Sequence, residues 1–429
     1  MRAWGGALAV ALWAGAAGAT IAPEEALATN TRLMLELVRH TPTYSPPVAS
    51  RAFAYVGVAA FEAVAGGDPS LRSLAGQLNG LTPPPAREAG LDYDEGVLLQ
   101  ATLATMLAEL FANTGPTGQR SLAGLSARLA EQAAEGLDPG VVARSRAQGE
   151  AVARHVLAWA ATDGGAVVQN LGFPVAMELP GGPGAWTPTS RLVLQQLPLL
   201  PDWGFNRTFA MPDGASCPVA DPIPYSEEEG SAFHLQAEEV LETSRALTQE
   251  QAEIARFWAD DAMLSVTPPG HWVSIAQQVL DAREAPLDLR VEVMAVLGVA
   301  LADAFIGCWR EKYRFNTLRP VTYIRAQLDP VFEPLLLTPP FPEYPSGHST
   351  QSGAAATVLT ALLGEVAFTD RTGEDDGLAP RSFPSFWAAA EEAGLSRLYG
   401  GIHFRQAIEE GLAQGRCVGA YAAALETRR

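Results

Sequence analysis

The sequence has few of the residues that mark several common classes of protein. Its 429 residues include only three cysteines, Cys217, Cys308 and Cys417, which are widely spaced and form no Cys-X-X-Cys pair. This spacing indicates neither a disulfide framework nor a zinc site. We expect each cysteine to be a small buried apolar residue, and one oxidised pair stays open as the alternative.

Positive charge is also scarce. Lys and Arg number 29 against 48 Asp and Glu, which gives a formal net charge of −19. Nucleic acids and anionic membrane surfaces bind to basic patches, so we expect neither as a partner. A local group of basic side chains would stand out against this acidic background.

Long hydrophobic runs are expected only at the N-terminus. Met1-Arg2 is followed by an apolar run over residues 3–17 and then by Ala17-Gly18-Ala19, which predicts a secretory signal peptide over residues 1–19. We predict no membrane span in the rest of the chain. The expected protein is exported and bacterial, either periplasmic or extracellular, and a homodimer is one open oligomeric state.

Helical periodicity predicts an all-α protein in three parts after the signal peptide. Residues 20–162 should form an N-terminal helical bundle and residues 229–429 a C-terminal one. Residues 163–228 are too rich in proline and glycine for regular helix, and we expect them to wrap over the bundles through apolar anchors such as Trp186, Trp203 and Phe205. Helices are expected at 29–40, 46–65, 95–113, 117–135, 139–161, 228–243, 249–264, 272–285, 287–315 and 386–398.

The stretch 341–352, Phe-Pro-Glu-Tyr-Pro-Ser-Gly-His-Ser-Thr-Gln-Ser, predicts a site for an anion. Ser346 is a favourable N-cap for the apolar helix that follows, and the free N–H groups at a helix start attract anions. Gly347 lets the backbone approach a ligand closely, and His348 has an ordinary pKa near neutrality. A helix cap with an incidental histidine is the alternative.

Further cations lie elsewhere in the C-terminal half. Lys312 and Arg319 are seven residues apart, so they would project from nearly the same face of a helix. Arg397 and His403 would lie on different faces of an unbroken helix, but Gly400-Gly401 between them would let them converge. Such a set would neutralise a trianionic oxyanion, although a solvated basic face is the alternative. The candidate residues are Lys312, Arg319, Ser346, Gly347, His348, Arg397 and His403.

Other polar residues have ordinary structural explanations. Asp260 and Asp261 fit helix-end charges, and His271 fits a structural histidine. The acidic run 369–377 lacks the spacing of an EF-hand calcium loop, so we assign it to a solvent-exposed loop.

The order and spacing of the candidate residues resemble the signature of the vanadium-dependent haloperoxidase and type 2 phosphatidic acid phosphatase superfamily. The resemblance covers the segments 312–320, 345–348 and 396–403. The length of the chain and the segments 258–261 and 267–271 are similar to the haloperoxidases rather than to the shorter phosphatases. The resemblance implies two four-helix bundles, as in vanadium chloroperoxidase, with the site in the C-terminal bundle.

The resemblance also implies a role for each residue. His403 would bind vanadium in a vanadate cofactor, His348 would take a proton from hydrogen peroxide, and Lys312 would polarise the peroxide. A halide would then be oxidised to a hypohalous acid that reacts with a small organic acceptor. Trp309 and Phe341 match the halide side of the site in chloride-oxidising members, although both also fit an ordinary core. Asp261 matches an acid near that pocket, and the vanadate oxygens would be held by Lys312, Arg319, Ser346, Gly347 and Arg397.

One position departs from the family pattern. The family usually has Asp four residues after the vanadate-binding histidine, where it would orient the imidazole, and this chain has Ala407 instead. We expect Glu409, Glu410 or a backbone carbonyl to replace that carboxylate.

Two other functions stay open. The same residues would serve an acid phosphatase, in which phosphate occupies the site, His403 attacks phosphorus and His348 protonates the leaving alkoxide. A non-catalytic oxyanion-binding protein would follow if Ala407 disables the site.

Overall fold

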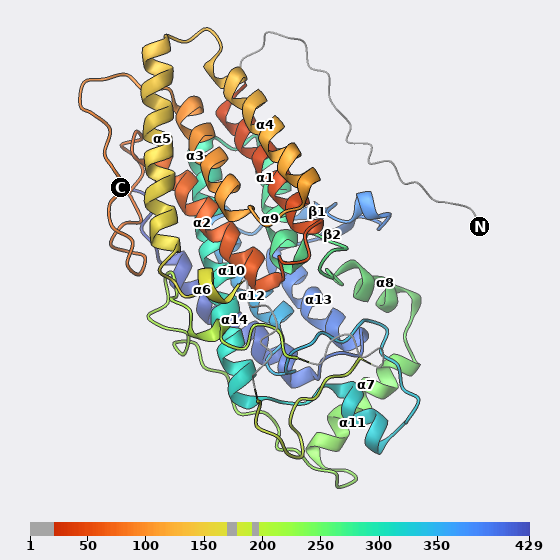
Figure 1. Ribbon diagram of the computed structural model, residues 1–429. Helices are drawn as coiled ribbons and strands as arrows, with labels where there is room; N and C mark the ends of the chain where they lie inside the picture. The colour runs from red at the N-terminus through yellow and green to blue at the C-terminus, as the bar shows by residue number, and fades with distance from the viewer. Residues whose placement is uncertain (1–20, 170–177, 191–196) are drawn as a thin grey trace.

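The computed structural model describes residues 21–169, 178–190 and 197–429, and it confirms an all-α fold (Figure 1). Two short strands, β1 (Phe368–Asp370) and β2 (Arg381–Phe383), pair antiparallel. The predicted signal peptide lies outside the described residues. The helices are α1 (Pro23–Arg39), α2 (Pro46–Ala65), α3 (Glu95–Leu110), α4 (Pro116–Ala134), α5 (Pro139–Ala160), α6 (Gly165–Val168), α7 (Ala232–Arg245), α8 (Gln249–Phe257), α9 (Thr267–Ala282), α10 (Leu287–Phe315), α11 (Pro320–Gln327), α12 (Gly347–Leu363), α13 (Phe386–Tyr399) and α14 (Arg405–Ala423).

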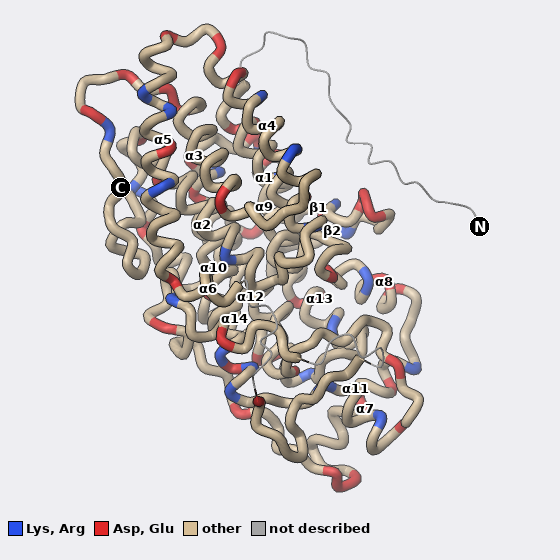
Figure 2. Tube along the Cα trace, viewed as in Figure 1, with Lys and Arg blue, Asp and Glu red and all other residues tan. Residues whose placement is uncertain are grey.

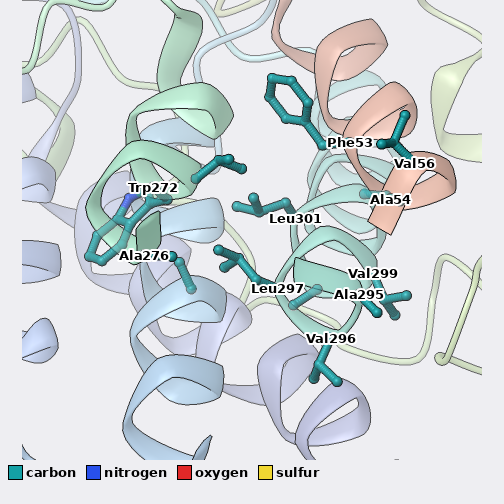
Figure 3. Packing of buried hydrophobic residues seen from close by; sticks show 14 of the residues in the cluster. Phe53, Ala54, Val56, Trp272, Ala276, Ala295, Val296, Leu297, Val299 and Leu301 are labelled. Carbon is teal, nitrogen blue, oxygen red and sulfur yellow. The ribbon is translucent and has the colours of Figure 1, made fainter. Parts of the chain in front are cut away.

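Helix α10 connects two groups of helices. It packs against α2, which belongs to the group α1 to α5, and also against α12 and α14, which pack with α13 (Figure 1). The contact with α2 is close, because a Cβ atom at Gly298 would lie 2.8 Å from the Cα of Ala54, and one at Gly57 would lie 2.6 Å from the Met294 carbonyl oxygen. Around this contact, apolar side chains of α2, α9 and α10 share one core (Figure 3). The division at residues 163 and 228 stays a prediction.

Helices α2 and α10 are long and apolar enough to cross a membrane by length and composition, contrary to our expectation. In each helix, 94% of the most apolar window is buried inside the protein. A helix that is apolar all round is also what the centre of a large helical core requires. Packing in the core therefore accounts for their hydrophobicity.

The expected helix boundaries are wrong on both sides of the turn that joins α8 to α9. Helix α8 ends at Phe257 because the backbone soon becomes left-handed at Asp260, where φ is 50°. Helix α9 begins at Thr267, earlier than expected, with prolines in its first turn, where a missing N–H group costs no hydrogen bond. His271 consequently lies inside α9 and not in a loop.

The described parts of the segment 163–228 hold both buried and exposed aromatic residues. Trp186 and Trp203 are buried, which confirms them as anchors. Phe205 is 74% exposed, so its assignment as an anchor is wrong. The segment holds only a four-residue helix, α6, and one short 3-10 turn among its described residues.

The cysteines do not all remain reduced. Cys217, at the end of that segment, forms a disulfide with Cys417 of α14, and Cys308 is free and buried. The alternative of one oxidised pair is therefore confirmed. This bond fastens the wrapping segment to the helix that follows His403.

Removing the disulfide should lower the free energy of unfolding without changing the fold. The bond closes a loop with a sequence separation of 200, for which loop-closure entropy sets an upper value of about 5 kcal/mol. We expect urea unfolding of a Cys217→Ala/Cys417→Ala variant to show a lower midpoint than the oxidised wild type. Adding a reductant should shift the wild type in the same direction and leave the double variant unchanged; an equal shift in both proteins would contradict the prediction.

Candidate active site

Acidic and basic positions are interspersed along the chain (Figure 2). The candidate residues differ from this pattern because their cationic side chains are buried together. Lys312 and Arg319 have no exposed surface and Arg397 has 1%. Burial first, and then the charges of these three residues and His348, hold the pKa of His403 well below its ordinary value. The turn at Gly400-Gly401 thus brings Arg397 and His403 into one site, as the sequence predicts.

The start of α12 forms the floor of the site. Ser346 is its N-cap, and the Ser346 hydroxyl accepts a hydrogen bond from the Ser349 N–H at 3.3 Å. The N–H groups of Gly347 and His348 have no acceptor within the helix, and the helix dipole adds positive potential there. A Cβ atom at position 347 would lie 3.6 Å from the Trp309 ring and 3.9 Å from Lys312 Cε, so glycine leaves this space free.

Lys312 is the only lysine in the sequence. Its Nζ donates to three backbone carbonyls, those of Pro342 at 3.0 Å, Glu343 at 2.9 Å and Pro345 at 2.5 Å. Burial lowers the pKa of this ammonium group to about 7. The backbone before α12 therefore holds the amine in place with dipoles instead of a paired carboxylate.

The two arginines also bind mainly to backbone oxygens. Arg319 donates from Nε to the Phe341 carbonyl and from Nη1 to the Ile402 carbonyl, both at 2.9 Å. Its Nη2 is buried and has no partner among the described residues. Arg397 donates from Nη2 to the Trp258 carbonyl at 2.5 Å. Burial lowers the pKa of both guanidinium groups to about 10, so both stay charged at neutral pH.

His348 keeps one ring nitrogen free. Its ring forms a hydrogen bond with the backbone of Trp258, and Nε2 is buried without a partner in the described part of the chain. Burial, followed by the charges of Arg397 and His271, holds the pKa of His348 well below its ordinary value. His348 is therefore a neutral imidazole with an unused nitrogen, which suits a proton acceptor.

The carboxylate next to His403 comes from Glu343. Its Oε1 lies 2.7 Å from His403 Nδ1 and also accepts the Phe404 N–H at 2.9 Å. Burial raises the pKa of Glu343 to about 7, and the charges of Arg319 and Lys312 oppose that rise. Neither Glu409 nor Glu410 takes this place, so our expectation for the replacement is wrong. The sequence held one signal for Glu343, its position inside the stretch 341–352.

The aromatic pair lies against the cations, as the resemblance implies. The ring centroids of Trp309 and Phe341 are 4.9 Å apart. Lys312 Nζ lies 5.9 Å from the Trp309 centroid and 5.2 Å from the Phe341 centroid. Arg319 lies 5.0 Å from the Phe341 centroid. The two rings thus form an apolar wall beside a positive charge.

Behind His348 lies a buried ionic group that the sequence did not predict. His271 contacts Asp260 through Nδ1 at 3.0 Å and Asp370 through Nε2 at 2.7 Å. Burial lowers the pKa of His271, but the charges of Asp260 and Asp370 outweigh burial and raise it to about 10. The assignment of residues 369–377 to a solvent-exposed loop is therefore wrong at Asp370, because residues far apart in the sequence meet here.

This ionic group supports the site through Trp258. The His271 ring stacks on the Trp258 ring with centroids 4.5 Å apart, and the Trp258 backbone contacts both Arg397 and His348. Asp261 lies next in the same turn, and burial raises its pKa while the charge of Arg397 lowers it. Asp261 is therefore beside the site and is more than a helix-end charge.

The arrangement fits a small tetrahedral oxyanion better than a bare metal ion. The described residues contain no group of three or more His, Cys, Asp or Glu side chains that could hold a metal. They do contain buried cations, an unpaired guanidinium nitrogen at Arg319 and an unpaired imidazole nitrogen at His348. Donors of this kind bind oxygen atoms of an anion.

Several known proteins are similar to this chain in sequence or in fold. A family model for the second helical-bundle domain of VCPO matches residues 292–429. The structure of a bacterial vanadium-dependent iodoperoxidase is 36% identical, with a TM-score of 0.86 over 94% of this chain and 96% of that one. A holo-type bacterial vanadium-dependent chloroperoxidase, 17% identical with a TM-score of 0.71 over 91% of this chain and 93% of that one, shows the fold alone.

A curated relative matches more weakly. The vanadium chloroperoxidase of Curvularia inaequalis is 23% identical over an alignment of 258 residues, and the match covers 46% of this chain. The match spans 42% of the length of that protein.

The ion pairs of His271 should make stability depend on pH. The pKa of His271 is raised above its unfolded value of 6.5, so its stabilising effect is complete below pH 6.5 and is lost as the pH rises through about 10. A His271→Gln variant should be less stable than wild type by about 3 kcal/mol at pH 6.5. Urea unfolding of both proteins should show this difference shrinking toward pH 10.

The effect of His271 is read from the difference in free energy of unfolding between wild type and His271→Gln at each pH. Burial lowers the pKa of Lys312, so Lys312 contributes stability that rises over the same pH range and partly hides the effect of His271 in wild type alone. A difference between wild type and His271→Gln that stays constant from pH 6.5 to 10 would show that His271 is neutral in the folded protein.

Proposed function

Because the chain belongs to the vanadium-dependent haloperoxidase family, we propose that it oxidises halide ions with hydrogen peroxide when vanadate is bound. One observation carries this proposal. The buried side chains of Lys312, Arg319 and Arg397 lie near His403 and the start of α12. They would neutralise a trianion bound there, with the His403 imidazole beside its central atom.

His403 is the residue that would bind vanadium, through Nε2. Lys312, Arg319 and Arg397 would bind the oxygens of the anion together with the Ser346 hydroxyl and the Gly347 N–H. Bound vanadate would supply a Lewis acid that activates hydrogen peroxide, while the vanadium keeps one oxidation state. The unpaired Nη2 of Arg319 supports this assignment because a buried donor without an acceptor is costly.

His348 is the proposed base for hydrogen peroxide. Its low pKa keeps the ring neutral, and Nε2 is free to take a proton. The contact with the Trp258 backbone fixes the ring, so the accepting nitrogen does not need to be reoriented. Asp261, next to Arg397, adds a second ionisable group at the same edge.

The wall of Trp309 and Phe341 is the proposed halide site. A halide would gain from the charge of Lys312 while it loses little by leaving water, since the larger halides are weakly hydrated. The aromatic residue at 341 resembles the chloride-oxidising pattern, whereas the 36% identical structure is that of an iodoperoxidase. We therefore propose halide oxidation as the reaction class and a small organic acceptor for the hypohalous acid.

We also propose export from the cell. The predicted signal peptide over residues 1–19 and the disulfide between Cys217 and Cys417 both support it, because disulfides persist in oxidising compartments.

Halide oxidation should depend on vanadate. Purified protein with hydrogen peroxide and iodide, bromide or chloride should oxidise at least one halide only after orthovanadate is added. Triiodide absorbance and bromination of a phenolic dye measure the products. A His403→Ala variant should lose this activity by at least about 100-fold, because the ligand to vanadium is removed.

A phosphatase assay separates the rival function. Hydrolysis of p-nitrophenyl phosphate that orthovanadate inhibits, without halide oxidation, would replace the haloperoxidase assignment by an acid phosphatase. Binding of vanadate or phosphate without turnover in either assay would indicate an oxyanion-binding protein.

His348→Ala should separate catalysis from binding. His348 is proposed to move a proton and not to hold the anion, so the variant should bind vanadate with nearly the wild-type affinity. Its kcat for halide oxidation should fall by about 100-fold to 10,000-fold, the range for loss of a general base. Equilibrium dialysis with vanadate and steady-state kinetics measure the two effects; a parallel loss of both would show that His348 holds the anion.

A further inference from the structure

The hydrogen bonds of His403 define which ring nitrogen carries the proton. Arg319 Nη1 lies 3.1 Å from His403 Nε2. A guanidinium group only donates hydrogen bonds, so Nε2 must be the accepting, unprotonated nitrogen. Nδ1 then carries the single proton of a neutral ring and donates it to Glu343 Oε1 at 2.7 Å. The lone pair of Nε2 is therefore directed toward the guanidinium group and the anion site.

Glu343 is held so that it can fix this tautomer. The side chain is buried with 1% exposure, and the same oxygen that accepts from His403 accepts the Phe404 N–H at the N-cap of α14. The Glu343 carbonyl also accepts a hydrogen bond from Lys312 Nζ. One residue thus connects the imidazole, the start of a helix and a cation of the site.

A side chain at position 407, in α14, would reach the space beside the Glu343 carboxylate. Glu343 and Ala407 line one small cavity together with Tyr344 and Phe404. Ala407 is fully buried, four residues after His403, and its carbonyl accepts the Ser346 N–H at 2.9 Å. A carboxylate from 407 would therefore enter the space next to the one that Glu343 already occupies.

We propose that Glu343 is the positioning residue that holds His403 as the Nδ1–H tautomer, with Nε2 unprotonated and directed toward the oxyanion site, and that Ala407 is the small residue that makes room for it. The identity of the anion rests on the proposed function, whereas the tautomer of His403 does not. Hydrogen bonding to the other ring nitrogen is the means by which proteins select the nitrogen that binds a metal.

The first experiment reads the tautomer in protein without vanadate. The chain has six histidines, so selective 15N-histidine labelling gives a small set of ring signals, and a His403→Gln variant assigns those of His403. We expect a protonated Nδ1 and an unprotonated Nε2 in wild type. In Glu343→Ala only the contact with Arg319 still favours this tautomer, so a measurable fraction of the ring should carry its proton on Nε2. A proton on Nε2 of wild-type His403, or an unchanged tautomer in Glu343→Ala, would overturn the proposal.

The second experiment measures vanadate affinity by equilibrium dialysis. Glu343→Ala should bind vanadate about 10-fold to 100-fold more weakly, the usual effect of losing the partner of a ligating histidine. Glu343→Gln should bind with intermediate affinity, because its amide oxygen still accepts from Nδ1. This second variant also keeps the test valid if the alanine variant folds poorly.

Moving the carboxylate from position 343 to position 407 tests directly whether the two positions serve one function, with vanadate affinity as the measurement. Ala407→Asp in the wild-type background should weaken binding, since two carboxylates would share one buried cavity. In the Glu343→Ala background the same change should recover part of the affinity. Effects of the same sign in both backgrounds would show that the two positions do not serve one function.

Glu62 supplies a matched control. It is a buried glutamate away from the site that also accepts one backbone N–H, from Leu74, and one side-chain donor, from Ser73. Glu62→Ala should lower stability and leave the vanadate affinity and the His403 tautomer unchanged. If wild type itself binds no vanadate, the proposed function fails, and the tautomer measurement still decides the role of Glu343.

Discussion

The burial of three basic side chains in one small volume is the constraint on which the rest of the structure depends. An unpaired buried charge costs several kcal/mol, and here carboxylates supply only part of the compensation. Lys312 binds to three backbone carbonyls, and Arg397 binds to the carbonyl of Trp258. One nitrogen of Arg319 has no partner in the part of the chain that the structure describes. An anion that entered this site would supply the charge that the carboxylates do not.

The helices supply that core and place the charges. Helix α10 packs against both α2 and α12, so Lys312 near its end has a fixed position relative to the start of α12. The segment that includes Cys217 is tied to α14 by the disulfide, and Gln414 of the same helix donates to the Cys217 carbonyl at 3.0 Å. The elements around the anion site are therefore linked to one another by covalent and polar contacts as well as by apolar packing.

The sequence predicted most of the helices because helices follow local rules, and the resemblance to a known family indicated which residues would form the site. Apolar periodicity located most helices, and Ser346 is the expected N-cap. What it missed depends on contacts between distant positions. Asp370 reads as part of an acidic loop until the fold places it against His271. Glu343 lies in the stretch 341–352, but its role is visible only when the fold places it against His403. The helix limits near Asp260 failed because the backbone is left-handed at Asp260, Met263 and Thr267, and none of these residues is the glycine that would have indicated it.

The histidines near the site show how partners decide the chemistry of one side chain. His271 lies between two carboxylates and is charged. His403 contacts one carboxylate, but burial and the guanidinium of Arg319 keep its ring neutral. His348 has a backbone partner and cationic neighbours, so it is neutral with a free nitrogen. Groups whose environments move their pKa values apart take different roles in catalysis. The ion pairs of His271 and the proposed roles of His403 as anion ligand and His348 as base therefore follow from the groups that surround each ring. In this proposal Glu343, in the loop before α12, supplies the carboxylate that the family pattern places at position 407.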